Sequence, residues 1–197
     1  MKPLTDPERL ELNSTLHFIY TAHLFQARKG TNIPFVLHPI AVCNTVNRWG
    51  INDNTILKAS LAHDVLEDCP DVSEEDLKGI IGIDSLQIVK ELTFIPDSSS
   101  PLSPSKQKEE YIKQVGNKSI GALVIKIADR LNNVQDFMLE DSAYAYKYFK
   151  KAKPLFDSFF VKREDIENSY GEQVYINMID DLYRVGGMTQ TDEEKIG

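Results

Sequence analysis

The sequence predicts an all-α fold, and three observations support that class. Apolar residues recur at helical spacing along most of the chain, as in the stretch LELNSTLHFIY near its start. Ser or Asp, residues that commonly cap helices, stand directly before several of these stretches. No stretch shows a convincing alternation of apolar and polar residues, the pattern of a half-buried strand. The segment ALVIKIA could form a buried strand by composition, but helix signals on both sides favour a helix.

Turn residues divide the beginning of the chain. A first helix is expected over residues 7 to 26, and the glycine and proline of ARKGTNIPF then predict a loop. A second helix is expected over residues 38 to 49. It tolerates Pro39 in its first turn and stops at Gly50.

The next helices are marked at their starts. Asp53 or Asn54 can cap a helix that runs through ILKASLAHDVLED to about Cys69. Ser73 begins a short helix with three acidic residues in its first turn, where they favour the helix dipole, and this helix ends near the glycines that follow. Another short helix is expected over residues 84 to 92.

One segment departs from the rest in composition. Residues 94 to 105, FIPDSSSPLSPS, hold three prolines and five serines, and a mobile surface loop is expected there. The remaining helices are expected over residues 106 to 115, 120 to 137, 142 to 160 and 164 to 185. We expect one domain over residues 1 to 186 and a flexible tail over residues 187 to 197.

Charge and composition exclude several classes of partner. The formal net charge of −8 argues against a broad nucleic-acid surface, although a metal and a few convergent basic side chains could still bind a small anion. The start has no signal-peptide pattern, and no stretch reaches the roughly 18 apolar residues of a membrane span. We therefore expect a cytoplasmic protein without a membrane partner. Cys43 and Cys69 are too few for a disulfide framework and are expected to be small buried side chains.

A His–Asp pair stands in the otherwise apolar helix SLAHDVLEDCP. Burying His63 and Asp64 is costly unless they are paired or bound, and imidazole with carboxylate is a normal ligand set for Mn, Fe, Co or Zn. Asp64, Glu67 and Asp68 crowd one helix face, where they repel unless a cation neutralises them or one keeps its proton. A solvated helix C-terminus is the alternative, but acids there oppose the helix dipole. This segment therefore favours a functional site.

Two further candidates are weak when taken alone. Asp129 in IKIADRLNN would by itself be a surface partner of Arg130, and His38 in VLHPI would be a capping or core histidine. The sequence leaves open whether Lys126 and Arg130 face the same pocket.

The order of these pieces, HP, then HDxxED, then ADRLxN, resembles the HD superfamily of metal phosphohydrolases. The closer resemblance is to the hydrolase domain of RelA/SpoT-type proteins and to the small alarmone hydrolases. It runs from Ala22 to about Ala152, through AHLFQARKGTNIPFVLHPIAV, LAHDVLEDC, IKIADRLNNVQDF and KYFKKA. An HD dipeptide alone is a weak signal, whereas HDxxED with these flanking blocks is a strong one. The resemblance implies a single-domain HD-type helical bundle.

The resemblance also implies a role for individual residues. It assigns a metal, usually Mn²⁺ in this family, to His38, His63, Asp64 and Asp129. Glu67 and Asp68 correspond to the acidic pair that positions or activates the attacking water. The implied nucleotide contacts are Arg28 and Lys29 beside the guanine base, Asn133 at the ribose, and Tyr148 and Lys106 at the nucleotide or its phosphates. For the basic residues the alternative is solvated surface charge, and for Tyr148 it is helix packing.

The implied activity is hydrolysis of the 3′-pyrophosphate of guanosine alarmones, ppGpp or pppGpp, to GDP or GTP and pyrophosphate. The family often has a Lys or Asp shortly after the threonine of ELTF, whereas here Phe94 follows Thr93, so the phosphate contacts stay open. No synthetase domain is expected after residue 186, so the chain should degrade the alarmone without making it. Two alternatives remain: an HD phosphohydrolase for another nucleotide, and a catalytically silent nucleotide-binding module. Retention of all four ligands and both acids argues against the silent module.

Overall fold

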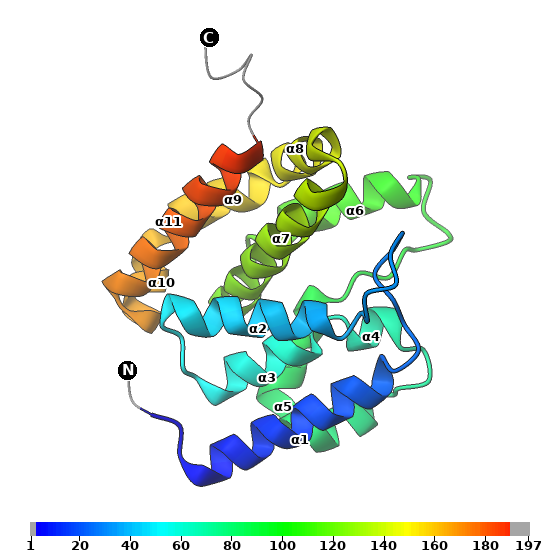
Figure 1. Cartoon of the computed structure of the whole chain (residues 1–197), viewed down its shortest axis with the longest axis vertical. Helices are drawn as coiled ribbons and strands as arrows, with labels where there is room; N and C mark the ends of the chain where they lie inside the picture. Colours follow the sequence, from blue (N-terminus) through cyan, green and yellow to red (C-terminus); the bar gives the residue numbers. More distant parts are fainter. Residues whose placement is uncertain (1–2, 190–197) are drawn as a thin grey trace.

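Every regular element of the described chain, residues 3 to 189 of this computed structural model, is a helix, as the sequence predicted (Figure 1). The helices are α1 (Asp6–Ala22), α2 (Leu37–Trp49), α3 (Asn54–Ala62), α4 (Val65–Asp68), α5 (Glu74–Leu92), α6 (Pro104–Val115), α7 (Ile120–Glu140), α8 (Ser142–Lys151), α9 (Lys153–Val161), α10 (Arg163–Tyr170) and α11 (Glu172–Thr189). An isolated antiparallel bridge between Ala27 and Pro34 closes the loop that follows α1. None of the described helices is both long and apolar enough to cross a lipid bilayer.

Local capping explains why several helices begin and end where the sequence predicted. The side chains of Asp53, Ser73 and Ser119 each accept a hydrogen bond from the backbone N–H three residues later, at the starts of α3, α5 and α7. Gly50 ends α2 in the left-handed region, with φ 109°, which glycine adopts without steric cost. These caps confirm the predicted boundaries.

Three helices that periodicity predicted as continuous are each divided in two. The first breaks between α3 and α4, where His63 Nδ1 donates to the Ser60 carbonyl, 2.8 Å away, in place of a backbone partner. Pro154 stands in the first turn of α9 and has no N–H for a continuous helix with α8. Gly171, with φ 97°, separates α10 from α11. Apolar periodicity continues across all three breaks, which is why it does not reveal them.

Other expected boundaries also move. The first helix ends at Ala22 instead of Gln26, because the Gln26 carbonyl accepts a bond from the Phe35 N–H (2.9 Å) across the following loop. The two short helices expected between residues 73 and 92 form the single element α5, kinked at Gly82. Helix α11 reaches Thr189, so residues 187 to 189 of the expected tail are helical, and the rest of that expected tail, residues 190 to 197, lies outside the described part of the chain.

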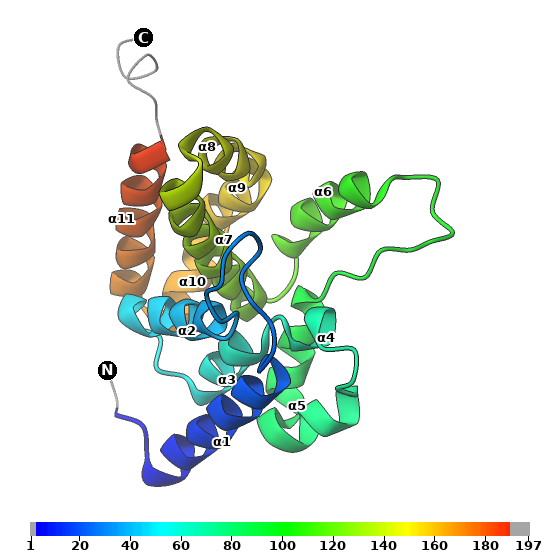
Figure 2. The ribbon, with the colours of Figure 1, turned by 45° about the vertical axis from the view of Figure 1, so that its right-hand side comes forward.

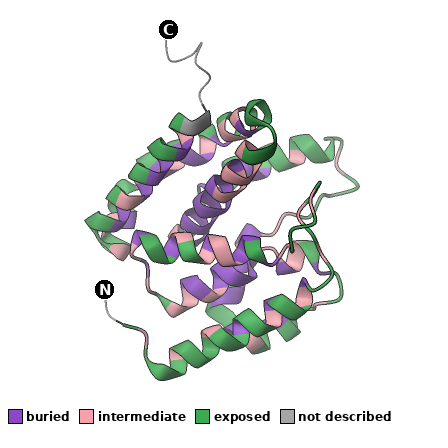
Figure 3. Cartoon of the chain, viewed as in Figure 1, coloured by how far each residue is buried: buried purple, intermediate pink, exposed green. Residues whose placement is uncertain are grey.

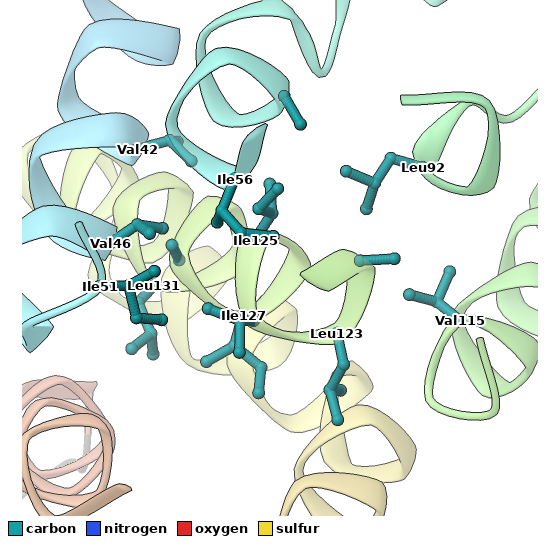
Figure 4. Close-up of a cluster of buried hydrophobic side chains, with 14 of the residues drawn as sticks. Val42, Val46, Ile51, Ile56, Leu92, Val115, Leu123, Ile125, Ile127 and Leu131 are labelled. Carbon is teal, nitrogen blue, oxygen red and sulfur yellow. The ribbon is translucent and has the colours of Figure 1, made fainter. Parts of the chain in front are cut away.

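Helix α7 is the centre of the molecule. It packs against α2, α8, α11 and α5, among others. Most of its residues are buried, as the purple stretch of this helix in Figure 3 shows. In the core, Ile125 of α7 belongs to the same apolar cluster as Ile56 of α3 and Val42 and Val46 of α2 (Figure 4). Three charged residues of this helix, Lys126, Asp129 and Arg130, are nevertheless buried. Buried charges on a core helix require partners, and these residues lead to the functional site.

The Ser/Pro segment projects from the body of the molecule together with α6 (Figure 2). Gln107 closes this loop, because its Nε2 donates to the carbonyls of Asp97 (3.0 Å) and Leu102 (2.9 Å). A surface loop is therefore present between α5 and α6, but α6 begins at Pro104, capped by Ser103, so the last two residues of the expected loop are helical; the mobility of the loop stays a prediction. Both cysteines are free, with Cys69 buried and Cys43 half-buried.

Candidate metal centre and active site

The four predicted metal ligands come from distant parts of the sequence and meet at one point. His38 lies in the first turn of α2, His63 and Asp64 lie at the break between α3 and α4, and Asp129 lies in the middle of α7. His38 Nε2 lies 3.2 Å from Asp129 Oδ1 and 3.5 Å from Asp64 Oδ2. His63 Nε2 lies 3.1 Å from the same Asp64 oxygen. Two imidazoles and two carboxylates thus aim their ligand atoms at one another.

Hydrogen bonds fix which ring nitrogen each histidine presents. His38 Nδ1 lies 2.7 Å from Asn132 Oδ1, and His63 Nδ1 lies 2.8 Å from the Ser60 carbonyl. Each ring therefore donates from Nδ1 and turns Nε2, the nitrogen that a metal would bind, into the cluster. Sequence reasoning missed Asn132, although its place three residues after Asp129 on the same helix was a usable signal.

The arrangement fits a divalent metal. His63 Nε2 is buried, and no described residue gives it a hydrogen bond of good geometry. Ligand atoms of His38, His63 and Asp129 all lie within 4.8 Å of one another. Divalent transition metals are commonly bound by imidazole nitrogens together with carboxylate oxygens, and this cluster offers both.

Electrostatics keep the two carboxylates of the cluster ionised. Burial would raise the pKa of Asp64, but the neighbouring His63 lowers it to about 2. Burial acts on Asp129 in the same way, yet the Lys126 ammonium, 2.8 Å away, and His38 hold its pKa well below the ordinary value. Burial would lower the pKa of His63, and the same carboxylates raise it to about 9. Asp64 and Asp129 are therefore anionic at neutral pH, the state that a metal ligand needs.

The predicted acidic pair lies beside this cluster on α4. Glu67 accepts a hydrogen bond from the Phe94 N–H (3.2 Å) and pairs with Lys108 Nζ at 3.3 Å. Burial, together with the negative charges of Asp64 and Glu67, raises the pKa of Asp68 to about 6. A carboxyl group that titrates near neutrality can accept or donate a proton during a reaction. The two acids thus differ: Glu67 is held by partners, whereas the pKa of Asp68 is raised towards neutrality.

A cavity of about 210 Å³ joins the cluster to the acids and to several basic side chains. Of the predicted residues, those that line it are His38, Asp64, Glu67, Asp68, Asp129, Arg28, Asn133 and Tyr148. A larger pocket of about 880 Å³ lies next to it, and Lys29 lines that pocket. Arg28, Phe35, Asp68 and Asn133 line both, so the two form one site with two compartments.

Arg28 stands at the boundary between the compartments. Its Nη2 donates to Asn133 Oδ1 and to Asp136 Oδ2, each at 2.7 Å, and its guanidinium lies 5.9 Å from the Phe35 ring centroid. Asn133 in turn donates to Asp129 Oδ1 at 2.5 Å. The loop after α1 is thereby tied to α7 through Arg28. Asp136 was missed because a single acid on a helix gives no sequence signal.

Among the predicted nucleotide contacts, Lys106 differs in lining neither compartment. It is exposed near the start of α6, whereas Lys108, two residues later, lines the small cavity. Two residues on a helix are about 200° apart around its axis, so only one of the two lysines can face the site. Lys126 and Arg130, whose orientation the sequence left open, both line the cavity.

Comparisons with known proteins identify the family of this chain. The family model described as HD domain matches residues 15 to 167. Guanosine-3′,5′-bis(diphosphate) 3′-pyrophosphohydrolase MESH1 of Drosophila melanogaster is 29% identical over 177 residues, which cover 88% of this chain and 93% of that protein. The MESH1 protein of Mus musculus is 30% identical over 131 residues, covering 66% of this chain and 70% of that protein.

A bacterial relative is much longer than this chain, and a solved structure has nearly the same extent. The probable guanosine-3′,5′-bis(diphosphate) 3′-pyrophosphohydrolase of Mycoplasma pneumoniae is 32% identical over 109 residues, 51% of this chain but only 15% of that protein. A solved structure described as a metazoan ortholog of SpoT that hydrolyzes ppGpp matches with a TM-score of 0.70 and 26% identity. The match covers 95% of this chain and 99% of the chain in the solved structure. The helical bundle, the His–Asp cluster and the match over residues 15 to 167 together show that this chain belongs to the HD domain family.

Proposed function

We propose that this chain hydrolyses the 3′-pyrophosphate of guanosine alarmones with the help of Mn²⁺, in the cytoplasm. One observation carries the proposal: residues of the His–Asp cluster and the pair Glu67 and Asp68 line one small cavity that opens into a nucleotide-sized pocket at Arg28. Relatives of matching length are named as hydrolases of this substrate. Hydrolysis would give GDP or GTP and pyrophosphate.

The proposed metal ligands are His38, His63, Asp64 and Asp129. The bound metal would lower the pKa of a water molecule and polarise a phosphoryl oxygen. Two imidazoles and two anionic carboxylates leave positions open for both. Mn²⁺ is proposed over other divalent ions on the family resemblance.

Glu67 and Asp68 would orient the attacking water molecule and accept its proton. Glu67, held by the Phe94 N–H and Lys108, orients it toward the phosphorus atom. Asp68, with its pKa of about 6, accepts the proton as the water oxygen attacks. The bond from the phosphorus to the ribose O3′ breaks, O3′ takes up a proton, and pyrophosphate leaves.

The nucleoside would occupy the larger pocket. Arg28 and Lys29 would lie beside the guanine base, where a planar guanidinium can stack on a ring in a way that an ammonium cannot. Asn133, at the boundary of the compartments, would contact the ribose. Lys106 would require a change in α6 to reach a phosphate, and Lys108 is the better-placed lysine.

The test is an assay of pyrophosphate release from ppGpp by metal-stripped protein supplied with Mn²⁺, Mg²⁺ or Zn²⁺. We expect release that is greatest with Mn²⁺, and Asp64→Ala should lose both metal binding and activity. Asp157→Asn is the matched control, because Asp157 pairs with Lys153 on the exposed face of α9. A fully active Asp64→Ala variant would refute the metal assignment. A preference for a nucleoside 5′-monophosphate would show that the chain is an HD phosphohydrolase for another nucleotide. Binding of ppGpp without turnover in Mn²⁺ would show that it is a catalytically silent nucleotide-binding module.

A further inference from the structure

Arg130 is a buried cation for which the described residues provide no anionic partner. Its side chain is only 5% exposed, it lines the small cavity, and its Nε has no hydrogen-bond partner among the described residues. The neighbouring cations differ. Lys126 pairs with Asp129 at 2.8 Å, and Arg28 pairs with Asp136 at 2.7 Å. Burying an unpaired charge is unfavourable, so this guanidinium is set up for an anion that enters the cavity.

Tyr148 holds Arg130 in place. The guanidinium carbon lies 4.0 Å from the Tyr148 ring centroid, close enough for a cation–π contact. The Tyr148 ring is held in turn by Phe137 of α7, with 5.0 Å between centroids and an edge-to-face angle of 80°. Stacking uses the face of the guanidinium and leaves the N–H groups along its edge free to donate in the plane. One face of the Tyr148 ring is therefore covered by Arg130, which changes the role expected for this tyrosine.

Both lysines that line the cavity already pair with carboxylates. Lys108 contacts Glu67 at 3.3 Å, and Lys126 contacts Asp129, so each neutralises a carboxylate of the site. Arg130 is left to neutralise the ligand. A planar guanidinium can donate two parallel hydrogen bonds to phosphoryl oxygens, which gives this position both charge and geometry for a phosphate.

We propose that Arg130 binds the phosphoryl oxygens of the substrate at the metal cluster, and that Tyr148 is a positioning residue that acts through Arg130. The inference rests on the proposed function for the identity of the substrate. The role of Arg130 beside the His–Asp cluster does not depend on that identity, because its guanidinium would bind the phosphoryl oxygens of any phosphate ester that enters the cavity.

The first experiment measures binding of inorganic pyrophosphate to the Mn²⁺-loaded protein by calorimetry. We expect Arg130→Gln to bind it about 10- to 100-fold more weakly, and Arg130→Lys to show a smaller loss because the charge remains. Mn²⁺ affinity should be unchanged in both. Arg163→Gln is the matched control: Arg163 also lies over an aromatic ring, that of Tyr175, but on the exposed helix α10. Pyrophosphate affinity equal to wild type in Arg130→Gln would overturn the proposal.

The second experiment tests whether Tyr148 acts through Arg130. Tyr148→Phe keeps the ring and should bind pyrophosphate like wild type, whereas Tyr148→Leu should bind it several-fold more weakly. If the tyrosine acts through the arginine, adding Tyr148→Leu to Arg130→Gln should cause no further loss. An equal loss in both backgrounds would show that Tyr148 contacts the ligand directly and would overturn its positioning role.

The two proposals fail in different ways. If wild type releases no pyrophosphate from ppGpp but binds inorganic pyrophosphate in an Arg130-dependent way, the proposed function falls and this inference stands. If wild type hydrolyses ppGpp and Arg130→Gln retains both kcat/KM and pyrophosphate affinity, the inference falls and the function stands.

Discussion

His38 and His63 present the same ring nitrogen to the cluster because each has its Nδ1 engaged by an oxygen atom. For His38 that oxygen belongs to the Asn132 side chain, one turn beyond Asp129 on α7. Removing it frees the imidazole to rotate and to change tautomer. A single amide on α7 therefore fixes the direction of the His38 ring, which belongs to another helix.

Asn132→Ala should lower the affinity for Mn²⁺ by about 10- to 100-fold while leaving the fold intact. Metal titration of the stripped protein measures this. Asn117→Ala serves as control, because Asn117 is exposed in the turn before α7. Equal metal affinities in Asn132→Ala and wild type would show that the Asn132 contact does not orient His38.

The acidic pair should matter for rate and not for metal binding. Glu67→Gln and Asp68→Asn each remove a group that orients water or takes its proton, so kcat should fall by about 10²- to 10⁴-fold. Mn²⁺ affinity should change little, since the four ligands remain. Glu75→Gln, on the exposed face of α5, is a control expected to be fully active. Wild-type turnover in both variants would remove these acids from the reaction.

The sequence revealed these residues unevenly, and the reason is physical. Asp129 is weak when taken alone and is recognisable only because the order of the motifs links it with His38 and His63. Arg130 and Lys108 carry no such mark, because a basic residue on a helix is ordinarily solvated. Their roles depend on burial and on the rotation of α6 and α7 about their axes, which composition and spacing leave undetermined.

At the scale of elements, the loop after α1 and the short helix α4 are joined by one side chain. Gln26 Nε2 donates to the Asp68 carbonyl at 2.8 Å, while its Oε1 lies 2.7 Å from His23 Nδ1. The Gln26 carbonyl also accepts from the Phe35 N–H. Gln26 thus links the backbone of Asp68 to the segment that carries Arg28.

Gln26→Ala should lower kcat by about tenfold or more, because a small displacement of Asp68 moves its carboxyl group relative to the attacked phosphorus. The affinity for Mn²⁺ should not change, since no metal ligand is touched. Parallel measurement of turnover and metal binding separates the two effects. Loss of metal affinity equal to the loss of turnover would mean that Gln26 supports the whole cluster and not Asp68 in particular.

The helices that carry the site differ in how well the sequence predicts their bounds. Helix α7 was predicted from its first residue to Phe137, because Ser119 caps it and an uninterrupted apolar pattern follows, but its last three residues, to Glu140, were not predicted. The division between α3 and α4 was not predicted, because it depends on His63 bonding to the Ser60 carbonyl, a side-chain contact within the site itself. The functional residues thus change the local helix that the sequence pattern favours.

At the scale of the whole molecule, α11 is fastened to α2, the helix that carries His38. Asp181 of α11 accepts hydrogen bonds from Arg48 Nη2 (2.6 Å) and Nη1 (3.1 Å) and from Trp49 Nε1 (2.8 Å), and Arg184 adds another at 2.9 Å. Trp49 is buried, so its N–H depends on this carboxylate. This contact holds the last helix of the described chain against α2, at the end of α2 away from the His–Asp cluster.

Burial would raise the pKa of Asp181, but hydrogen bonds from Arg48, Arg184 and Trp49 outweigh it and lower the pKa. A carboxylate with a lowered pKa in the folded state stabilises the protein fully above its ordinary pKa of about 4. That stabilisation is lost as the pH falls through the lowered value, where the folded protein also takes up the proton. Asp181→Asn should therefore reduce the free energy of unfolding by about 1 to 3 kcal/mol at pH 7, because the amide carries no charge and keeps only one of the two oxygens that accept hydrogen bonds from Arg48, Arg184 and Trp49.

Urea denaturation of wild type and Asp181→Asn between pH 7 and the lowest pH at which both stay folded measures this difference. It should be constant down to about pH 5 and shrink below about pH 4, because the protonated Asp181 side chain then carries the same charge as the asparagine of the variant. The exposed Asp157→Asn should show a much smaller difference throughout, since solvent screens its pair with Lys153. A difference that stays constant below pH 4 would attribute the stabilisation to the shape of the Asp181 side chain and not to its charge.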